Sequence, residues 1–420
     1  MTMDEVSELY SRFEECSGVV TDSRRITPDS MFFALHGASF DGNAFAADAV
    51  AAGARYAVID SDEPLRSHPE LSDRLIRVED TLVTLQSLAR EHRRRLAIPI
   101  ISIAGSNGKT TTKELVACVL AEKFAVSATR GNLNNHIGVP LTLLAMTRDV
   151  EFGVVEMGAS ACGEIALLAS IAEPNYGIIT NIGRSHLEGF GGVEGIRRGK
   201  GELFDYLAGN GGRAFVPKEN DVLVEMAAER AGMAVESYSV EIADGYRSNL
   251  EGDYNRLNIA AAVEVGTYFG VAPERIAAAI AEYVPSNNRS QRVESGRNSL
   301  IVDCYNANPS SMAVALENMK RDEAEHKLLI LGDMLELGEW SAEEHIKVAE
   351  AALEIENAAV ISVGEEFMKI SRQIDTAGRW LAFETTGAAA EHLKTASVSC
   401  CKILIKGSHR WALESLVALL

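Results

Sequence analysis

Short apolar runs alternate with segments of helical periodicity along most of the chain. In its first part, apolar positions gather at 19–20, 31–35 and 57–59, between alanine-rich helical stretches. Further along, the clearest apolar runs are 100–104, 152–156, 176–180, 214–217, 300–303, 328–331, 360–363 and 403–405. Continuous runs of this kind are typical of strands buried on both faces of a parallel sheet. Their alternation with helices predicts an α/β fold with helices on both faces of each sheet.

The alternation divides into three blocks, which we interpret as three domains because 420 residues are too many for one core. We expect residues 1–96 to form a small α/β domain, 97–296 a central domain built on a parallel sheet and 297–420 a C-terminal domain that repeats the alternation. Near the first boundary, the basic run 93–95 is interpreted as a solvated helix end rather than a nucleic-acid patch. The segment 285–289 is interpreted as the hinge between the second and third blocks.

Composition and charge narrow the expected partners. Forty basic and 60 acidic residues give a formal net charge of −20, which disfavours nucleic acid or an anionic membrane as the main partner. The six cysteines show no CxxC spacing and indicate reduced thiols. The N-terminus does not resemble a signal peptide, and no apolar run approaches the roughly 20 residues of a membrane span. We therefore expect a soluble cytoplasmic protein.

The glycine loop at 105–113, GSNGKTTTK, is the most informative segment of the chain. It follows the apolar run 100–104 and precedes a helix-like segment, so backbone N–H groups and a helix N-terminus would face phosphate oxygens. Lys109 would reach the outer phosphates and Thr110 would offer its hydroxyl to Mg²⁺. The full P-loop spacing has a glycine where this chain has Ile103, so the loop is a shortened variant. The predicted ATP-binding residues of the loop are Gly105, Ser106, Asn107, Gly108, Lys109, Thr110 and Thr111.

Two further strands are predicted to end in metal-ligating groups. The run 152–156 ends at Glu156, and the run 176–180 leads into a loop that contains His186. Ligands of open parallel sheets bind beyond the carboxyl ends of the strands. If both strands flank the P-loop strand, Thr110, Glu156 and His186 converge on one Mg²⁺ site of hydroxyl, carboxylate and imidazole ligands.

Lys200 is predicted to point into the protein. Ile196 lies four residues before it and Leu203 three residues after it, so the three share one helix face. A lysine on a buried face has a lowered pKa and an available neutral amine. A snorkelling lysine fits the same pattern.

Two polar clusters fit either turn chemistry or substrate recognition. The segment 131–140 contains Asn134 and Asn135 between glycines. The segment 303–309 places Asp303, Tyr305 and Asn306 just beyond the end of a predicted strand. Cys304, beside Asp303, is a candidate alkylatable thiol.

Together these segments resemble the Mur ligases over nearly the whole chain, and within that family the branch that adds D-alanyl-D-alanine. The resemblance is carried by the order and spacing of several blocks. They are TDSR (21–24), GSNGKTTTKE (105–114), GNLNNHIGVPLTLL (131–144), EMGA (156–159), NIGRSHLEGFG (181–191), YNANPSSM (305–312), LGDMLELG (331–338) and IKGS (405–408).

The resemblance implies that the central domain is a P-loop ATPase-like parallel sheet and the C-terminal domain is Rossmann-like. It also implies roles for particular residues. The N-terminal domain binds the uridine nucleotide of the substrate, and Lys200 is carbamylated and helps hold a second Mg²⁺. Asn255 and Asn258 lie near the ATP base, Arg292 faces the terminal phosphate and Asp303 lies near the ribose. The implied substrate-binding residues are Ser23, Arg24, Asn134, Asn135, Tyr305 and Asn306. The implied catalytic residues are Lys109, Glu156, His186, Lys200 and Arg292, and the implied metal ligands are Thr110, Glu156, His186 and carbamylated Lys200.

The implied activity is an ATP- and Mg²⁺-dependent ligation of D-alanyl-D-alanine to UDP-N-acetylmuramoyl tripeptide through an acyl phosphate. This reaction serves peptidoglycan synthesis, and through it cell-wall biogenesis, cell shape and cell division. We expect a monomer whose partners are small-molecule substrates. The alternatives are a MurE-type ligase that adds the third amino acid and a non-catalytic nucleotide-binding subunit. The chain lacks the Asp-Asn-Pro-Arg motif typical of the former.

Four positions depart from the family pattern. Ala104 stands where a threonine commonly precedes the glycine loop, but this side chain is not a required ligand. Asn43 stands where histidine is common, which affects the uridine site. Cys304 replaces a serine or threonine, and His409 precedes Arg410 where arginine usually comes directly, which leaves the acceptor contacts there unassigned.

Overall fold

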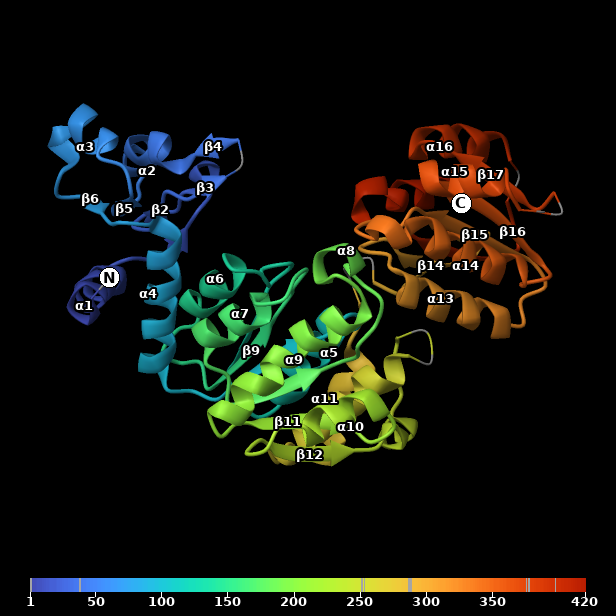
Figure 1. The fold of residues 1–420 in the computed structure, drawn as a ribbon, viewed down its shortest axis with the longest axis horizontal. Coiled ribbons are helices and arrows are strands. Elements are labelled where there is room, and N and C mark those ends of the chain that lie inside the picture. Colours follow the sequence, from blue (N-terminus) through green and yellow to red (C-terminus); the bar gives the residue numbers. More distant parts are fainter. Residues whose placement is uncertain are drawn as a thin grey trace.

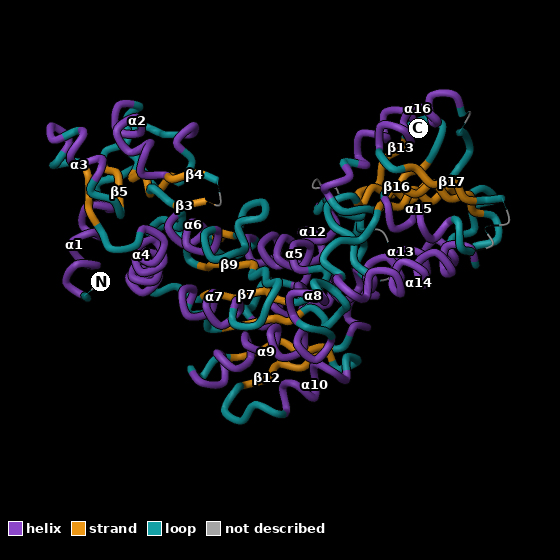
Figure 2. Tube along the Cα trace, turned by 45° about the horizontal axis from the view of Figure 1, so that its top comes forward, coloured by secondary structure: helices purple, strands orange, loops and turns teal. Residues whose placement is uncertain are grey.

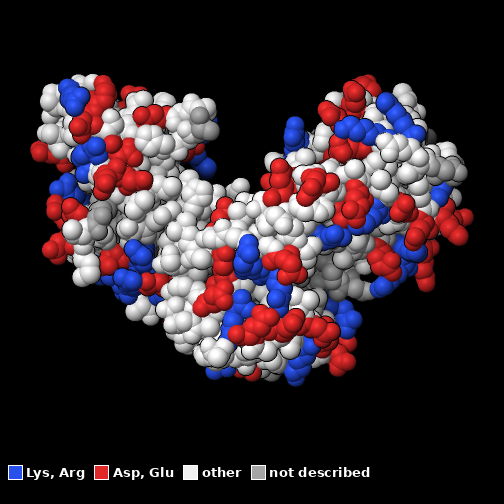
Figure 3. Space-filling model, in the orientation of Figure 1, with Lys and Arg blue, Asp and Glu red and all other residues white. Residues whose placement is uncertain are grey.

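Three α/β units follow one another along the chain, each built on its own sheet. The computed structural model describes residues 2–37, 39–250, 252, 254–285, 289–374, 376, 378–396 and 398–420. The first and third units stand on either side of an open hollow above the central unit (Figures 1 and 3). The predicted α/β class with three domains is confirmed.

The N-terminal unit contains a parallel sheet in the order β1-β2-β5-β6 and a small antiparallel pair, β3 and β4. Its strands are β1 (Val19–Val20), β2 (Met31–Phe33), β3 (His36–Gly37), β4 (Phe40–Asp41), β5 (Tyr56–Ile59) and β6 (Leu75–Arg77). Its helices are α1 (Met3–Glu14), α2 (Ala46–Ala51), α3 (Glu63–Ser67) and α4 (Thr81–Leu96), with 3₁₀ turns at Ser23–Arg25, Gly42–Phe45 and Pro69–Leu71.

The central unit contains a parallel sheet in the order β12-β11-β10-β7-β9-β8. Its strands are β7 (Ile100–Ala104), β8 (Val126–Ala128), β9 (Phe152–Glu156), β10 (Tyr176–Ile179), β11 (Arg213–Pro217) and β12 (Ala234–Tyr238). Its helices are α5 (Lys109–Ala121), α6 (Gly138–Leu144), α7 (Glu164–Ala172), α8 (Leu187–Phe190), α9 (Val193–Gly209), α10 (Asp221–Ala228), α11 (Asn255–Tyr268) and α12 (Pro273–Glu282), with a 3₁₀ turn at Val240–Gly245.

The C-terminal unit contains a sheet in the order β13-β14-β18-β15-β16-β17, parallel except for β13. Its strands are β13 (Gln291–Glu294), β14 (Ser299–Asp303), β15 (Lys327–Gly332), β16 (Ala358–Val363), β17 (Trp380–Phe383) and β18 (Lys402–Lys406). Its helices are α13 (Pro309–Arg321), α14 (Ser341–Leu353), α15 (Glu365–Ser371) and α16 (Thr386–Thr395), with 3₁₀ turns at Gly338–Trp340, His409–Trp411 and Leu413–Leu419.

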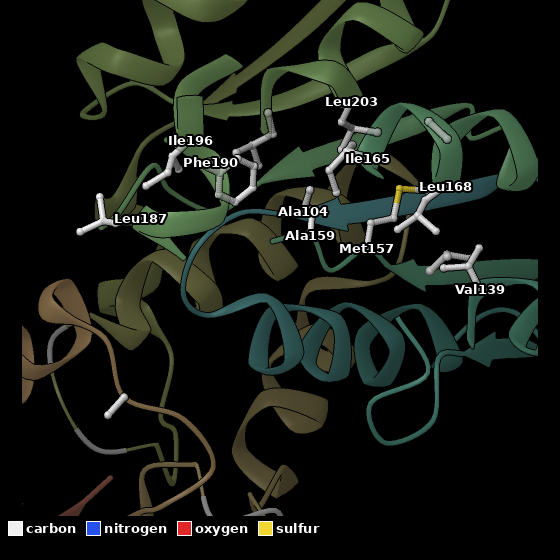
Figure 4. Close-up of a cluster of buried hydrophobic side chains, with 14 of the residues drawn as sticks. Ala104, Val139, Met157, Ala159, Ile165, Leu168, Leu187, Phe190, Ile196 and Leu203 are labelled. Atoms are coloured by element: carbon white, nitrogen blue, oxygen red, sulfur yellow. The ribbon is translucent and has the colours of Figure 1, made fainter. Parts of the chain in front are cut away.

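The central sheet is buried on both faces, as its continuous apolar strands predict. On β7, Ile100 and Ala104 belong to the core cluster that includes α7 and α9, part of which is drawn in Figure 4. Ile101 and Ile103 belong to the opposite cluster, which includes residues of α5 and α11. Strands are therefore the inner layer and helices the outer layers of this unit (Figure 2). Burial on both faces leaves the strand ends as the place for polar chemistry.

The predicted strands match the observed ones within two residues at each end, except for a few short or edge strands. Sequence reasoning missed β3, β4, β6, β8, β12, β13 and β17. The third sheet begins with β13, a few residues before the predicted boundary at 296. The domain boundaries stay a prediction. Of the predicted hinge, Ser286, Asn287 and Asn288 lie outside the described residues.

No described helix combines the length and apolar character needed to cross a bilayer.

The basic run at the end of α4 is solvated only in part. Arg94 and Arg95 are exposed, as expected, but Arg93 is buried, which corrects the prediction for that residue. Its guanidinium donates to the carbonyl of Ala172 at 2.9 Å, to that of Glu173 at 3.0 Å and to Asn175 Oδ1 at 2.9 Å. These acceptors lie at the end of α7 and in the loop between α7 and β10. Arg94 pairs with Glu173 at 2.6 Å. The run therefore fastens the helix that carries the N-terminal unit to the central unit.

Replacing Arg93 with alanine should lower the free energy of unfolding by about 2–4 kcal/mol, because buried carbonyl groups lose their donor. The measurement is denaturant unfolding of the full chain. Arg95→Ala is the matched control, since Arg95 is partly exposed and pairs with Glu91 on its own helix. Its effect should stay below about 1 kcal/mol. If both variants lose the same free energy of unfolding, the buried Arg93 contacts do not hold α4 to the central unit.

Candidate active site

The glycine loop is held in a phosphate-binding shape by contacts with the segment after β10. Ser106 N donates to the Asn181 carbonyl at 3.0 Å, and Asn107 N donates to Asn181 Oδ1 at 3.1 Å. Gly105 and Gly108 have φ of +129° and +79°. A Cβ at Gly105 would lie 2.1 Å from Thr180 Oγ1, so a side chain there would break the packing. The loop leads directly into α5, whose N-terminus faces the same side as the strand ends.

Lys109 occupies the first turn of α5. Its Nζ donates to the carbonyls of Gly105 at 2.9 Å and Ser106 at 3.1 Å. Burial lowers the pKa of Lys109 to about 8, while the Glu156 carboxylate acts in the opposite direction. At neutral pH the ammonium therefore remains largely charged within the loop.

A cavity of about 910 Å³ lies over this loop, between the central and C-terminal units. It brings together most of the residues predicted from the sequence. These are Ser106, Asn107, Gly108, Lys109, Thr110, Thr111, Asn134, Asn135, Glu156, His186, Asn255, Asn258, Asp303, Tyr305 and Asn306. Gly105, Lys200, Arg292, Ser23 and Arg24 are not part of its lining.

Glu156 fits a cation ligand. It ends β9, which flanks β7 on one side as β10 does on the other, so the predicted convergence of the three strands is present. Its side chain is 1% exposed. One carboxylate oxygen accepts from Asn134 Nδ2 at 2.8 Å, whereas Oε2 is buried without a protein partner. Thr110, on the first turn of α5, lines the same cavity.

These groups suit Mg²⁺, which takes oxygen ligands and keeps several waters. The unpartnered Oε2 of Glu156 is the structural feature that fits a cation, because an ionised oxygen buried without a donor is unfavourable. Among the described residues, no three His, Cys, Asp or Glu side chains form a ready-made metal cluster. The site would therefore rely on mixed ligands, namely the hydroxyl of Thr110, the carboxylate of Glu156 and the imidazole of His186.

His186 lies in the loop between β10 and α8 and lines the cavity. Its ring Nδ1 pairs with a carboxylate oxygen of Glu336 in the C-terminal unit. The hydrogen bond from His186 holds the pKa of the Glu336 carboxyl below its usual range. Nothing in the sequence pattern linked these two residues.

Lys200 points inward, as its position on the helix face predicts. It is 1% exposed on α9, its Nζ donates to the Ala159 carbonyl at 2.8 Å, and it lies 4.7 Å from the centre of the Phe190 ring. Burial, and after it the charge of Lys109, lowers the pKa of Lys200 to about 7. The snorkelling alternative is excluded. Ala159 lines the cavity, so Lys200 lies directly behind its wall.

The far side of the cavity comes from α11 and from the C-terminal unit. Asn258 accepts from Thr112 Oγ1 at 3.0 Å and donates to Asn255 Oδ1 at 2.8 Å, which fixes both amides at the start of α11. Asp303, at the end of β14, forms an ion pair with buried Lys406. Lys406 therefore also lines the cavity, where its ammonium pairs with Asp303. The sequence analysis had assigned it no role.

Arg289, rather than Arg292, reaches the cavity. Arg292 lies on β13 with its side chain 55% exposed, and its Nε donates to Glu294 at 2.8 Å. The Arg289 guanidinium stacks 3.8 Å from the centre of the Tyr305 ring, and its charge contributes to the lowered pKa of Lys109. Sequence reasoning missed Arg289, although a basic residue within the predicted hinge was a signal.

Cys304 does not behave as predicted. It is 1% exposed, and burial raises the pKa of its thiol to about 12. A buried thiol with so high a pKa is unreactive. The expectation of an alkylatable cysteine at the nucleotide site is therefore wrong.

The predicted substrate residues Ser23 and Arg24 lie apart from this cavity, in the N-terminal unit. Arg24 is exposed and its guanidinium pairs with Asp22 at 2.9 Å. Asn43 is buried and ties the β3–β4 pair to the end of β5, since its Nδ2 donates to Asp41 and Asp60, both at 2.8 Å. Asn43 thus has a structural role at the position that departs from the family pattern.

Three family models match successive parts of the chain. They are "Mur ligase family, catalytic domain" at residues 15–93, "Mur ligase middle domain" at 103–268 and "Mur ligase, glutamate ligase domain" at 288–409. The UDP-N-acetylmuramoyl-tripeptide–D-alanyl-D-alanine ligase of Bacillus subtilis (strain 168) is 36% identical over 350 residues, covering 78% of this chain and 76% of that protein.

Solved structures agree with these matches. MurF from Acinetobacter baumannii superimposes with a TM-score of 0.86 at 28% identity, covering 98% of this chain and 97% of the other. MurF from Thermotoga maritima in complex with ADP superimposes with a TM-score of 0.83 at 25% identity, covering 96% of each chain.

Proposed function

The chain belongs to the Mur ligase family, and on that premise we propose that it joins D-alanyl-D-alanine to a UDP-N-acetylmuramoyl tripeptide with the use of ATP. The observation that carries the proposal is the cavity shared by two units. The phosphate loop and Glu156 line it from the central unit, and Asp303 and Tyr305 from the C-terminal unit. This function belongs to peptidoglycan synthesis, and hence to cell-wall biogenesis, cell shape and cell division.

The reaction has two balanced steps. A tripeptide carboxylate oxygen attacks the γ-phosphorus of ATP, so the new P–O bond replaces the bond to ADP and gives an acyl phosphate. The amine of D-alanyl-D-alanine then attacks the acyl carbon, and phosphate leaves as the amide forms and the amine loses its proton. Because the protein makes no covalent bond, its contribution is positioning and charge neutralisation.

Named residues divide this work. The ammonium of Lys109 stabilises the negative charge of the outer phosphates, and the stacked guanidinium of Arg289 adds positive charge on the opposite wall. Thr110, Glu156 and His186 hold Mg²⁺, and a carbamate on Lys200 contributes to a second Mg²⁺. Bound magnesium supplies further neutralisation of phosphate charge. Asn255 and Asn258 contact the base, and Asp303 the ribose.

The remaining site residues bind the peptide and uridine substrates. Asn134, Asn135, Tyr305 and Asn306 face the cavity from two units and suit the tripeptide and the dipeptide. Ser23 and Arg24 bind the uridine diphosphate in the N-terminal domain at 1–96. Arg292 reaches the terminal phosphate only if the C-terminal domain moves toward the P-loop, a closing motion common to enzymes with sites between domains.

A cytoplasmic monomer is also part of the proposal. ATP is an intracellular substrate, and all six cysteines are free thiols, which suits a reducing compartment. Monomer state stays a prediction of the sequence, and sedimentation of the purified chain at micromolar concentration tests it directly.

The test is ATP-dependent phosphate release with the UDP-N-acetylmuramoyl tripeptide. We expect release only when D-alanyl-D-alanine is present, together with a pentapeptide product identified by its mass. Single D-alanine and a diamino acid are the controls. A MurE-type ligase would give a different result. It would turn over a UDP-muramoyl dipeptide with a diamino acid and would not turn over D-alanyl-D-alanine. Nucleotide binding without any turnover would point to a non-catalytic subunit.

A further inference from the structure

We propose that Glu336, a residue of the C-terminal domain, is a positioning residue that orients the His186 imidazole of the central domain toward its metal. The inference rests on the proposed function, in which His186 is a metal ligand. The proposed metal ligands all lie in the central domain, and Glu336 would support one of them from the C-terminal domain.

The hydrogen-bond chemistry of the pair sets the orientation. A carboxylate only accepts hydrogen bonds, so the ring Nδ1 that pairs with Glu336 must carry a hydrogen. In the neutral imidazole Nε2 then has the free lone pair, and His186 lines the cavity that holds Glu156. A ligating histidine commonly donates its other ring N–H to a carboxylate, which fixes the ring and raises its basicity as a ligand.

The backbone around the pair is built to bring the two residues together. His186 and Glu336 have φ of +52° and +59°, in the left-handed region that residues other than glycine adopt infrequently. Glu188 N also donates to the Glu336 carbonyl at 3.3 Å. The contact therefore involves two fitted loop segments and not only two long side chains.

Other contacts close to this pair also join the central and C-terminal domains. Arg184 N donates to Ser310 Oγ at 2.7 Å, and its guanidinium pairs with buried Glu344 at 3.1 Å. Asn308 Nδ2 donates to Asn107 Oδ1 of the phosphate loop at 2.8 Å. The C-terminal domain thus docks on both the loop and the His186 segment.

Stability alone does not account for the pair. The Glu336 side chain is 59% exposed, and ion pairs this open to solvent contribute little to folding. A role in orienting His186 explains why both His186 and Glu336 keep the left-handed backbone conformation. It follows that metal binding and docking of the two domains favour each other, because the ligand is aligned only while they touch.

The experiment measures the Kd for Mn²⁺, used as a paramagnetic probe of the Mg²⁺ site, by the free-ion EPR signal of the full chain. Glu336→Ala should weaken Mn²⁺ binding about tenfold, as loss of an outer partner does. Glu336→Gln should retain most of the affinity, because its amide oxygen still accepts from Nδ1–H. Glu339→Ala is the matched control, since this exposed carboxylate lies three residues away, and its Kd should match that of the unmodified chain.

Each contrary outcome overturns a different statement. If Glu336→Gln is as weak as Glu336→Ala, the carboxylate acts through charge and not through orientation. If Glu336→Ala binds Mn²⁺ as tightly as the unmodified chain, or more tightly, Glu336 does not position His186. Glu156→Gln and His186→Ala serve as reference variants. If both leave the Kd unchanged, the proposed metal site itself is wrong, whereas the ligase assay tests the activity separately.

Discussion

Replacing Lys109 with methionine is expected to lower kcat/KM by about three orders of magnitude while the protein stays folded. The ammonium is held inside the phosphate loop by the Gly105 and Ser106 carbonyls. Bound triphosphate would offer it much stronger acceptors, so its charge is available where charge develops during transfer. Groups that neutralise a transferring phosphoryl contribute about 10³–10⁵-fold. Methionine fills a similar volume and cannot replace this charge.

The fold should tolerate this change. Burial already lowers the pKa of Lys109 to about 8, which means that its charged form is less favourable in the protein than in water. Removing the charge should therefore leave the thermal midpoint unchanged or raise it. The measurements are steady-state kinetics, nucleotide affinity and thermal unfolding. Lys394→Met is the control, because this exposed lysine pairs with Glu391 on its own helix, α16, away from the cavity. A Lys109→Met enzyme with near-normal kcat/KM would contradict the assigned role.

The sequence predicted the central domain well because its signals are local. A buried strand, a glycine loop and a helix follow one another within 100–121, and each element has its own pattern. The inward direction of Lys200 was predictable for the same reason, since Ile196 and Leu203 define its helix face. Cys304 could have been placed from the same kind of signal. Leu300 and Val302 alternate along β14, and Cys304 continues the alternation one residue after the strand ends. All three are buried, so the cysteine faces the core.

Other features depend on contacts between distant parts of the chain, which no local pattern shows. His186 and Glu336 are 150 positions apart, and their pairing exists only because two domains dock. Arg93 looked solvated because a run of three arginines usually is, yet carbonyls of a loop about 80 positions away bury it. The sequence analysis placed Arg292 at the nucleotide site, whereas Arg289 lines the cavity, and this error also reflects the three-dimensional arrangement. The alternation of β13 turns Arg292 outward, whereas Arg289 lies before the strand and stacks on Tyr305.

Replacing Lys200 with alanine is the second change for which we expect a large effect, a loss of at least about 100-fold in kcat. The reason is the proposed carbamate, which would form when the neutral amine attacks CO₂ and releases a proton. Burial lowers the pKa of Lys200 to about 7, so the neutral amine predominates above pH 7 and declines as the pH falls below it. Alanine removes the carboxylate that the carbamate would present to the second Mg²⁺.

Two measurements separate the carbamate from a merely structural lysine. In bicarbonate-depleted buffer, the unmodified enzyme should lose activity as the pH falls from 8 to 6, and added bicarbonate should restore most of it. A lysine that only donates to the Ala159 carbonyl would not respond to bicarbonate. Acetate should partly restore Lys200→Ala, because the space left by the side chain admits a short carboxylate beside the same metal. If the folded variant turns over at a near-normal rate, Lys200 has no part in catalysis. If it is inactive and neither bicarbonate nor acetate has an effect, the lysine acts through its amine, and the second Mg²⁺ takes its ligands from elsewhere in the site.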